Sequence, residues 1–357
     1  MTSSSDVSRE FAVSVVVSTH NRQDDLGAAL ESLLHQVGVV PYEVLIVDNN
    51  STDDTRAVVE RAIGSSPVPL KYLFEPRQGV SYGRNTGILH ARAPIIAITD
   101  DDCRPAPDWI AAIAQTFEKY PDIDCIGGRV VPAWPDYVPS WLTTLQMGPL
   151  AICEHGDDDL PVDAGHAALC LLTANFASRR SVFEKAGLFS TDYPRGQDRE
   201  LQLRMWRAGC RGLYVPRLVV MVPIPPARLK KPYFRSWYRK YGRVHARMEL
   251  LDRLDKHGRL VSPPVDSQLF GSSMHVYRAL AMSVLGWLLA AVRRRESDRV
   301  YHENRICYLG TYIATSFKRA RQTQPGSMTS QVARIFIRRL RRKFASPRQT
   351  ATPPGVV

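Results

Sequence analysis

Short apolar runs alternate with helical patterns over the first 131 residues of the chain. Five runs rich in β-branched residues cover residues 12–18, 42–48, 70–74, 94–99 and 124–131. Continuous apolar runs are typical of strands that are buried on both faces, as in a parallel sheet. Stripes with i, i+3, i+4, i+7 spacing lie between the first runs and predict amphipathic helices. The alternation predicts an α/β fold with a doubly wound, mostly parallel sheet flanked by helices.

Three helical stripes can be followed residue by residue. The first consists of Leu26, Ala29, Leu30, Leu33 and Leu34. The second consists of Val58, Val59, Ala62 and Ile63, and the third of Leu201, Met205 and Ala208. Ser51 or Thr52 can cap the second helix. In the third helix, Glu200 and Arg204 are spaced for an i, i+4 ion pair.

Polar side chains gather where the predicted strands end. The first strand runs into STHNR, the second into DNNSTDD and the fourth into TDDDCRP. Doubly wound sheets bind ligands at the carboxyl ends of their strands. We therefore expect the functional site at this edge, where His20 can also line it.

Three adjacent carboxylates, Asp100, Asp101 and Asp102, end the fourth strand. Adjacent acids repel one another unless a cation lies between them, and Mg²⁺ on a diphosphate needs only one or two protein carboxylates. The alternative is an N-cap and turn before a helix that begins near residue 107. A second triplet at residues 157–159 follows no apolar run and is expected in a solvated loop. The contrast favours a metal site at the first triplet.

Other polar residues near this edge have two interpretations each. Asp48 can accept hydrogen bonds from a base or ribose, or it is a turn residue. The segment RQGVSYGRNTG contains G-x-S-x-G around Ser81, but four residues separate it from the preceding strand, which argues against a nucleophile elbow. Arg84 and Asn85 in that segment suit phosphate or ribose contacts. Asp198 begins a helix behind Gly196 and is either a general base or a helix N-terminal acid.

Two phosphate-binding motifs are absent from the sequence. No G-x-G-x-x-G follows the first strand, and no G-x-x-x-x-G-K-[ST] occurs. Metal and basic residues must therefore hold any phosphates. Trp134, Tyr137 and Trp141 lie in a predicted loop over the site, where they either stack on a bound ligand or anchor the loop.

Charge divides the chain into two unlike parts. Residues 1–210 have a net charge of −10, and residues 211–357 have a net charge of +22. The six cysteines form no C-x-x-C pair, and the N-terminal stretch has no apolar signal region, which together predict a cytoplasmic protein. A basic half can face nucleic acid, anionic lipid or a phosphorylated substrate.

The basic half contains two segments of interest. Residues 279–292 are uncharged, but a membrane span needs roughly 20 residues, so a buried or interfacial helix is expected. Residues 332–344 are amphipathic and cationic and suit an anionic membrane surface; the alternative is a disordered basic tail. We divide the chain into a flexible tail (1–11), a catalytic domain (12–222), a helical region (223–320) and a basic amphipathic or disordered tail (321–357).

Several segments, taken in order, resemble the inverting family 2 glycosyltransferases of GT-A fold. The resemblance covers residues 12–245 and includes VSVVVSTHNRQDDL, EVLIVDNNSTDDT, GVSYGRNTGILHA, IIAITDDDCRPAPDWI, NFASRRSVFEKAGLF and GQDRELQLRMWRAG. It implies that Asp102 and Asp100 hold Mg²⁺ or Mn²⁺ and that Asp198 is the catalytic base. The nucleotide-sugar site it implies consists of Thr19, Asn21, Asp48, Arg84, Asn85, Asp100 and Asp101. The acceptor side is expected at Asn175, with Trp134 and Trp141.

The sequence departs from the family pattern at two places. Gln197 replaces the Glu that usually precedes the base, and no His stands near Met221 or Val222, where many relatives carry a metal ligand. The metal is therefore expected to have one protein ligand fewer, or the activity to be weaker. The resemblance implies metal-dependent sugar transfer from a nucleotide-diphospho-sugar to a hydroxyl acceptor. The basic half leads us to expect a glycan or lipid-linked glycan as that acceptor, at a membrane surface. The alternatives are a non-catalytic nucleotide-sugar-binding protein and a nucleic-acid-binding protein, and no nucleic-acid motif supports the latter.

Overall fold

The computed structural model describes residues 11–323, except residues 39, 256 and 263–267. Its central element is a sheet of nine strands in the order β3-β2-β1-β4-β8-β6-β9-β5, with β7 paired to β9. The strands are β1 (Val13–Thr19), β2 (Tyr42–Asp48), β3 (Leu70–Phe74), β4 (Ile95–Asp100), β5 (Arg104–Pro105), β6 (Cys125–Ala133), β7 (Leu160–Val162), β8 (Phe176–Arg179) and β9 (Gly212–Pro223). All five predicted strands are present.

Parallel strands make up one half of the sheet. Strands β3, β2, β1 and β4 are parallel neighbours, and the side chains of β1, β2 and β4 are part of the buried core. Strand β8 is antiparallel to both β4 and β6, whereas β6 and β9 are parallel. The predicted mostly parallel α/β sheet is confirmed. The sequence pattern did not predict β8 and β9.

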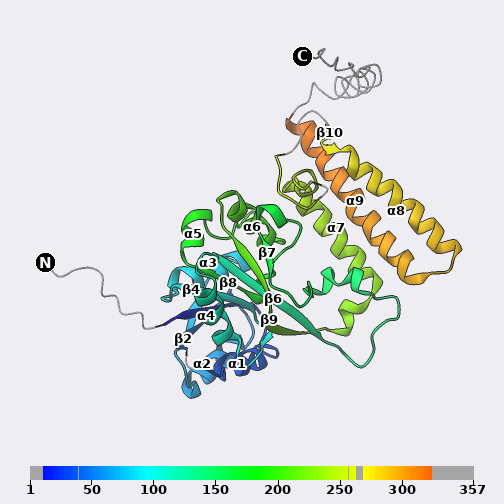
Figure 1. Cartoon of the computed structure of the whole chain (residues 1–357). Helices are drawn as coiled ribbons and strands as arrows, with labels where there is room; N and C mark the ends of the chain where they lie inside the picture. The colour runs from blue at the N-terminus through cyan, green and yellow to red at the C-terminus, as the bar shows by residue number, and fades with distance from the viewer. Residues whose placement is uncertain (1–10, 39, 256, 263–267, 324–357) are drawn as a thin grey trace, which may run out of the picture.

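Helices cover the sheet and form a projecting region (Figure 1). They are α1 (Leu26–Leu34), α2 (Thr55–Ser65), α3 (Val80–His90), α4 (Trp109–Lys119), α5 (Ser181–Ala186), α6 (Gln197–Arg207), α7 (Lys231–Arg247), α8 (Met274–Val292) and α9 (Glu296–Thr323). Short 3₁₀ turns lie at Thr144–Gln146, Gly148–Leu150, Ala164–His166, Thr173–Asn175, Pro226–Leu229 and Leu250–Asp252, and a small hairpin joins β10 (Gln268–Leu269) to β11 (Ser272–Ser273).

The helical stripes predicted from the sequence have different outcomes. All five residues of the first stripe are buried in α1. In α2 only Val59 of the predicted stripe is fully buried, and Ile63 is 40% exposed, so that prediction was wrong in extent. The cap of α2 also differs, because the carboxylate of Asp53, rather than Ser51 or Thr52, accepts hydrogen bonds from the Thr55 backbone N–H and hydroxyl. The predicted ion pair between Glu200 and Arg204 is present at 2.8 Å.

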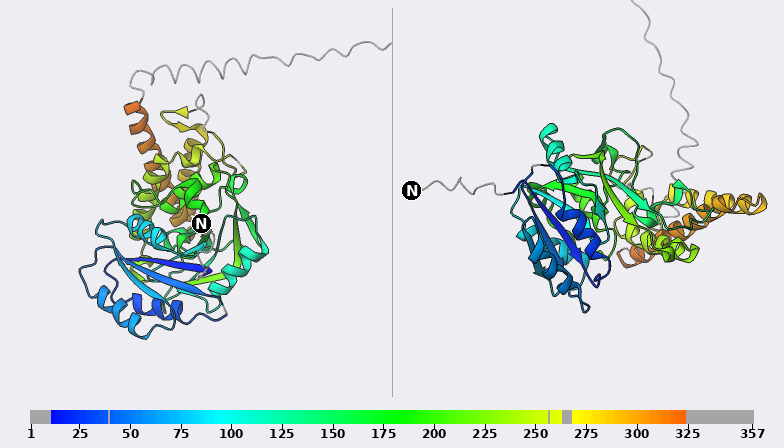
Figure 2. Two further views of the ribbon diagram at one scale, coloured as in Figure 1. Left: turned by 90° about the vertical axis from the view of Figure 1, so that its left-hand side faces the viewer. Right: turned by 90° about the horizontal axis from the view of Figure 1, so that it is seen from below.

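The C-terminal helices project from the side of the sheet domain (Figures 1 and 2). Helix α9 packs against α7 on one side and against α8 on the other. The predicted helical region is therefore present. The uncharged segment 279–292 lies in α8, which by length and composition alone could cross a membrane and is mostly unburied. The predicted amphipathic segment 332–344 lies outside the described residues.

Candidate functional site

The carboxyl ends of β1, β2 and β4 lie side by side. In the register of the sheet, Thr19 is opposite Asp48, and Ser18 is opposite Asp100. A cavity of about 400 Å³ opens at this edge. Its lining consists of Ser18, Thr19, His20, Arg22, Asn49, Gln78, Gly79, Val80, Arg84, Asp100, Asp101, Asp102, Cys103, Ala151, Ala174, Val222 and Arg228. The parallel strands thus bring the predicted polar segments together.

The acid triplet lies on one wall of this cavity. Asp100 is the last residue of β4, and Asp101 and Asp102 follow in a turn. The Arg84 guanidinium donates to Asp100 at 2.8 Å, whereas Arg22 stands 3.6 Å from Asp101 and 3.8 Å from Asp102. Arg228 lies 3.8 Å from Asp102. The two acids after the strand therefore have cations nearby, but those contacts are longer than hydrogen bonds.

Burial dominates the electrostatics of this triplet. It raises the pKa of the Asp101 carboxyl to about 6, although Arg22 lowers it. Burial and the neighbouring Asp100 also raise the pKa of Asp102, against the effects of Arg22 and Arg228. Buried carboxylates with incomplete charge compensation are suited to a further cation.

A divalent cation fits this donor set if a bound diphosphate and water supply its remaining ligands. Among the described residues, no three His, Cys, Asp or Glu side chains are placed to enclose a metal ion. Mg²⁺ and similar ions commonly take one or two carboxylates and complete their shell with water and substrate phosphates. Val222, in the region where the family resemblance leads one to expect a metal-ligating His, lines the cavity with an apolar side chain. The acids fit a metal that is shared with a diphosphate, and they do not form a closed metal cage.

Asp48 and Asn21 shape the loops beside the cavity and are not part of its lining. Asp48 is 2% exposed, and its carboxylate accepts hydrogen bonds from the Ser51 backbone N–H at 2.9 Å and the Tyr72 hydroxyl at 2.8 Å. Asn21 accepts from the Thr52 backbone N–H at 2.8 Å. These bonds tie the loop after β1 to the loop after β2.

Helix α3 brings Arg84 to the cavity and turns its neighbours away. The Ser81 hydroxyl donates to the Ser190 carbonyl at 2.9 Å, which agrees with the interpretation that it is no nucleophile. The Asn85 amide donates to the Phe189 carbonyl and accepts from the Phe189 N–H, each at 2.9 Å. Arg84 therefore lines the cavity, and Asn85 holds the segment that precedes α6.

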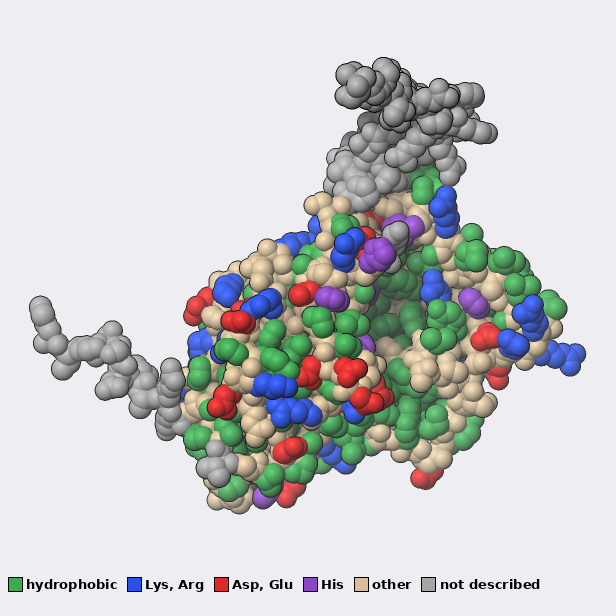
Figure 3. Space-filling view, in the orientation of Figure 1, with side chains coloured by type: hydrophobic (Ala, Val, Ile, Leu, Met, Phe, Trp, Pro, Cys, Tyr) green, Lys and Arg blue, Asp and Glu red, His purple; other side chains and the backbone are tan. Residues whose placement is uncertain are grey.

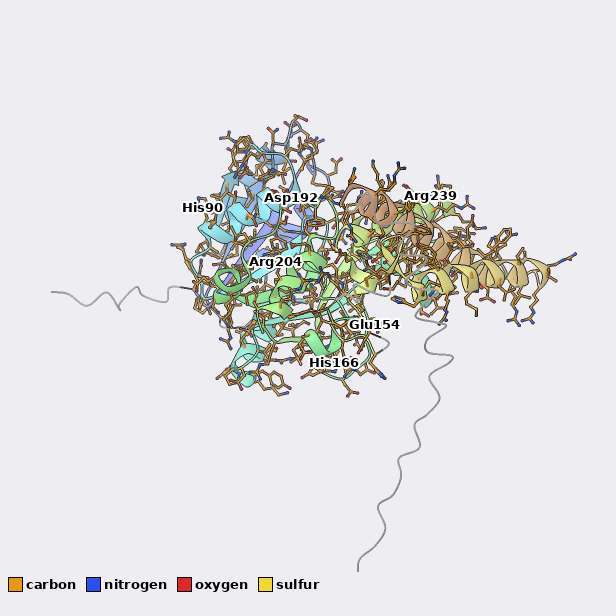
Figure 4. The ribbon with its side chains drawn as sticks, turned by 90° about the horizontal axis from the view of Figure 1, so that it is seen from above. His90, Glu154, His166, Asp192, Arg204 and Arg239 are labelled. Carbon is orange, nitrogen blue, oxygen red and sulfur yellow. The ribbon has the colours of Figure 1, made fainter. Side chains whose placement is uncertain are left out.

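Asp198 lies in the first turn of α6, behind a glycine in the left-handed conformation. Gly196 has φ 69° and precedes the helix as its N-cap. The Arg199 backbone N–H donates to the Asp198 carboxylate at 2.8 Å. Burial raises the pKa of Asp198, while Arg84 lowers it and Asp100 raises it, so the carboxylate lies within electrostatic reach of the cavity wall. Asp192, a second acid near the start of α6, is exposed in the loop before that helix (Figure 4).

The predicted acceptor residues lie in three different surroundings. Asn175 is buried, and its amide bonds to the Trp109 indole and to the carbonyls of Arg129 and Leu218. Trp141 is buried edge-on against Phe234, with ring centroids 5.0 Å apart, which is the anchoring role. Trp134 is 40% exposed after β6 and remains available to a ligand.

Four groups in the cavity wall were not predicted. Arg22 and Arg228 face the acids, and Gln78 contacts the ring of His20 at 2.8 Å. Asn49 accepts from the Gly79 N–H at 2.7 Å and so holds the start of α3. Arg22 and Asn49 stand in the polar segments after β1 and β2, which is the signal that identifies them. No comparable signal marks Arg228.

The second acid triplet is exposed, as predicted. Asp157 pairs with Arg129, and Asp159 accepts from the Tyr120 hydroxyl at 2.8 Å. None of its three acids lines the cavity. The two triplets therefore have different surroundings despite identical sequence.

Comparison with known proteins gives the fold and a family match for part of the chain. Residues 14–185 match the model of glycosyl transferase family 2. The chain is 28% identical over 199 residues to glucosyl-dolichyl phosphate glucuronosyltransferase of Haloferax volcanii, which covers 53% of this chain and 59% of that protein. It is 38% identical over 128 residues to an uncharacterized glycosyltransferase of Mycobacterium tuberculosis, with coverage of 35% and 53%. The chain thus spans less than two thirds of these relatives.

Solved structures share the architecture. Mannosyltransferase PcManGT from Pyrobaculum calidifontis, in complex with GDP-Man and Mn²⁺, matches with a TM-score of 0.58 and 20% identity over 89% of each chain. S. aureus TarS 1–349 matches with a TM-score of 0.50 and 17% identity, over 87% of this chain and 92% of that one. The predicted GT-A fold is confirmed. Residues 14–185, just under half of the chain, are therefore similar to glycosyl transferase family 2.

Proposed function

We propose that the protein transfers a sugar from a nucleotide-diphospho-sugar to a hydroxyl acceptor, with inversion at the anomeric carbon and with bound Mg²⁺ or Mn²⁺. The observation that carries this proposal is the cavity at the carboxyl ends of the strands, where three carboxylates and three arginines converge. Structural neighbours support a nucleotide-sugar donor, because one is in complex with UDP-GlcNAc and another with GDP-Man and Mn²⁺.

The donor diphosphate is assigned to the part of the cavity between the acids and the arginines. Arg22 and Arg228 approach Asp102 from two sides, and guanidinium groups are suited to phosphate oxygens. Asp102 and Asp100 are the residues that would hold the metal. The metal, when bound, neutralises charge on the leaving nucleoside diphosphate. Thr19, Arg84 and Asp101 line the same space and complete the donor site.

Asp48, Asn21 and Asn85 contribute to the donor site through the loops that they hold. The bonds of Asp48 and Asn21 fix the loops after β1 and β2, next to Thr19 and Asn49. A base or ribose bound there could form a hydrogen bond with the Asp48 carboxylate only if the hydrogen bond from the Tyr72 hydroxyl to that carboxylate were broken. This requirement makes base recognition by Asp48 a testable part of the proposal.

Asp198 is assigned as the base that takes the proton from the acceptor hydroxyl. Its burial raises its pKa, which suits a carboxylate that accepts and releases a proton. Direct attack of the hydroxyl on the anomeric carbon then gives inversion in one displacement. Helix α7 packs beside the start of α6, since a Cβ at Gly196 would lie 3.2 Å from the Val244 side chain, and on α7 Trp237 stacks on Tyr241 with ring centroids 3.7 Å apart. With the exposed Trp134, these rings are suited to sugar faces.

A glycan or lipid-linked glycan is the acceptor class that we favour. The name of the Haloferax volcanii relative specifies a glucosyl-dolichyl phosphate, a lipid-linked sugar. A soluble donor and a lipid-linked acceptor meet at a membrane surface, which places the enzyme at the cytoplasmic face in polysaccharide biosynthesis. The basic half of the chain supports this location by charge alone.

A donor screen tests the proposal. The purified protein is incubated with UDP-, GDP- and dTDP-sugars with Mn²⁺ or with a chelator, and both thermal stabilisation and sugar release are measured. One donor should raise the melting temperature only with the metal present, because the described residues contain no closed metal cage and the metal would be shared with the diphosphate. Stabilisation that is equal with chelator would contradict metal-dependent binding.

Two variants test whether metal-dependent donor binding depends on the first acid triplet. Asp102→Ala should abolish metal-dependent donor binding with the fold intact, and Asp158→Ala, in the exposed triplet, should bind as the wild type does.

Gln197 and the absent His keep a non-catalytic protein as the second candidate function. Donor binding without hydrolysis, and without transfer to any lipid-linked or free glycan, would favour that candidate.

A further inference from the structure

Helix α8 packs its small residues inward and leaves its large apolar residues outside. Ser283 and Ala290 are buried, and Gly286 lies so close to α9 that a Cβ there would be 2.3 Å from the His302 ring. The Ser283 hydroxyl also accepts from the Arg305 guanidinium of α9 at 3.2 Å. These three residues, spaced i, i+3 and i+7, lie at the contact with α9 along the second half of α8, and Val276 packs into the same contact near the start of the helix. A helix on the surface of a water-soluble protein has the opposite arrangement, with its large apolar residues facing the core.

The opposite face of α8 carries a continuous apolar surface. It consists of Met282, Val284, Leu285, Leu288, Leu289 and Val292. Leu285 is 50% exposed, Met282 66% and Val292 83%. The spacing of Met282, Leu285, Leu289 and Val292 places them in one row along the helix. Large exposed apolar patches in native proteins indicate a contact with another surface.

Cationic residues stand at both ends of this apolar face. Arg278 is exposed one turn before it, and residues 293–295, all arginine, form the turn into α9. Figure 3 shows apolar side chains along the projecting helices and Lys or Arg side chains at their far end. Within the part of the chain that the structure describes, Arg278, Arg293 and Arg294 pair with no carboxylate, and Arg295 has only a 3.8 Å contact with Asp298. Helix α8 itself contains no acid.

We propose that α8 docks the protein on an anionic lipid surface, with its apolar row in the acyl boundary and its terminal arginines at the headgroups. Apolar side chains between cationic ends match the two layers of a bilayer surface, since long arginine side chains reach phosphate groups from a buried stem. Each cation near an anionic bilayer adds to the attraction.

The charge pattern disfavours a second copy of the chain as the occupant. In an antiparallel pair of α8 helices, Arg278 of one copy would face residues 293–295 of the other, which are arginines. In a parallel pair, each arginine would face its own counterpart. Both arrangements bring like charges together, which is unfavourable at an interface. An anionic lipid surface satisfies both the apolar row and the arginines.

This docking deepens the proposed function, because it would bring the cavity to a lipid-linked acceptor. Vesicle binding is measured without donor, metal or acceptor, so the two proposals can fail separately. A protein that binds lipid and transfers no sugar would contradict only the function, and an active protein that ignores lipid would contradict only the docking.

Vesicle sedimentation of the full chain tests the docking. The wild type should sediment with vesicles of phosphatidylcholine and phosphatidylglycerol, and much less with phosphatidylcholine alone. The double variant Leu285→Glu, Leu289→Glu should lower the partition coefficient by about tenfold or more, since two charges would enter the acyl boundary. The matched control, Ile63→Glu with Leu89→Glu, replaces two exposed aliphatic residues of the catalytic domain and should bind as the wild type does.

Four further measurements make the result decisive. Replacement of residues 293–295 by Gln should remove the preference for anionic vesicles. Unchanged binding of the Leu285→Glu, Leu289→Glu variant would overturn the proposal, and circular dichroism confirms that this variant is folded. If sedimentation velocity shows instead that this variant converts a dimer into a monomer, the face joins two copies. Retention of the wild type in membranes after an alkaline carbonate wash would indicate a crossing helix and contradict surface docking.

Discussion

Asp198 combines burial with a position within electrostatic reach of Arg84 and Asp100. A base acts on the acceptor hydroxyl and has no contact with the donor diphosphate. We therefore expect Asp198→Asn to retain donor and metal affinity while turnover falls by about 10²–10⁴-fold. Calorimetry and a transfer assay measure the two effects separately. Transfer at the wild-type rate would reduce Asp198 to a helix-start acid and make Asp192 the next residue to test.

The pH profile gives Asp198 a second readout. A base works only when it is deprotonated, so activity should fall as the pH drops through the pKa of Asp198. Because burial raises that pKa, the acid limb should lie above the range of a solvated aspartate, whose pKa is about 3.9. The residual activity of Asp198→Asn should lack this limb. A limb that persists unchanged in the variant would assign it to another group.

Asp48 offers a test that separates base recognition from loop support. We expect Asp48→Ala to weaken nucleotide affinity, and Asp48→Asn to weaken it or to alter base preference. Tyr72→Phe is the control, because it removes the 2.8 Å bond to Asp48 and leaves the carboxylate in place. Tyr72→Phe should lower stability by about 1 kcal/mol, since it loses a single hydrogen bond. Donor binding by Asp48→Ala equal to the wild type would exclude a role in recognition.

The location of a single residue could be predicted from the sequence when its segment had one possible place in the sheet. The acid triplet directly follows an apolar strand, so the hydrophobic pattern alone places it at the carboxyl edge. Arg228 follows β9, a strand that the pattern did not identify, and so its approach to Asp102 could not be foreseen. Asn175 begins a segment that resembles the acceptor side, yet its amide is fully used by three core groups. Sequence gives the residue type, and only packing shows which bonds are already made.

At the scale of elements, the start of α6 depends on one glycine. Gly196 has φ 69°, and a Cβ there would lie 3.2 Å from the Val244 side chain of α7. Gly196→Ala should therefore destabilise the fold by about 1–2 kcal/mol, through backbone strain and crowding. Urea unfolding measures this change. Gly27→Ala is the control, because open space surrounds that position in α1, and its stability should be unchanged or raised by up to about 1 kcal/mol. Equal effects of the two substitutions would contradict the strain argument.

Strand and helix predictions failed where the chain is irregular or lies at an edge. Strand β9 contains Pro216 and Arg217, and its pairing with β6 shifts register between Gly128 and Arg129, so no continuous apolar run marks it. Helix α2 packs near β3, the strand at the end of the sheet order, and only one of its predicted stripe residues is fully covered. Strands β1, β2 and β4 lie inside the sheet, where burial on both faces makes the apolar pattern unambiguous.

At the scale of the whole molecule, charge and apolar surface are both concentrated beyond the catalytic domain. The net charge of +22 in residues 211–357 was visible in the sequence, as was the uncharged segment of α8. The structure adds the direction in which that segment faces, which the sequence could not supply because it depends on how α9 packs against it. Among the described residues, the apolar face of α8 and the arginines at its ends belong to one region that projects from the sheet domain (Figure 2).

Truncation after Gln322 separates the charge of the C-terminal segment from the apolar contact of α8. It removes seven Lys and Arg residues, no acid, and none of the α8 side chains that form the apolar row. The truncated protein should bind anionic vesicles more weakly at low salt, because each lost cation reduces the attraction to the bilayer. Raising the salt should weaken the full chain more than the truncated one, since salt screens charge and leaves apolar burial in place. Sedimentation with phosphatidylglycerol vesicles at several salt concentrations measures both effects. Identical salt curves for the two proteins would show that the removed residues make no electrostatic contribution and would assign lipid binding to α8 and its arginines alone.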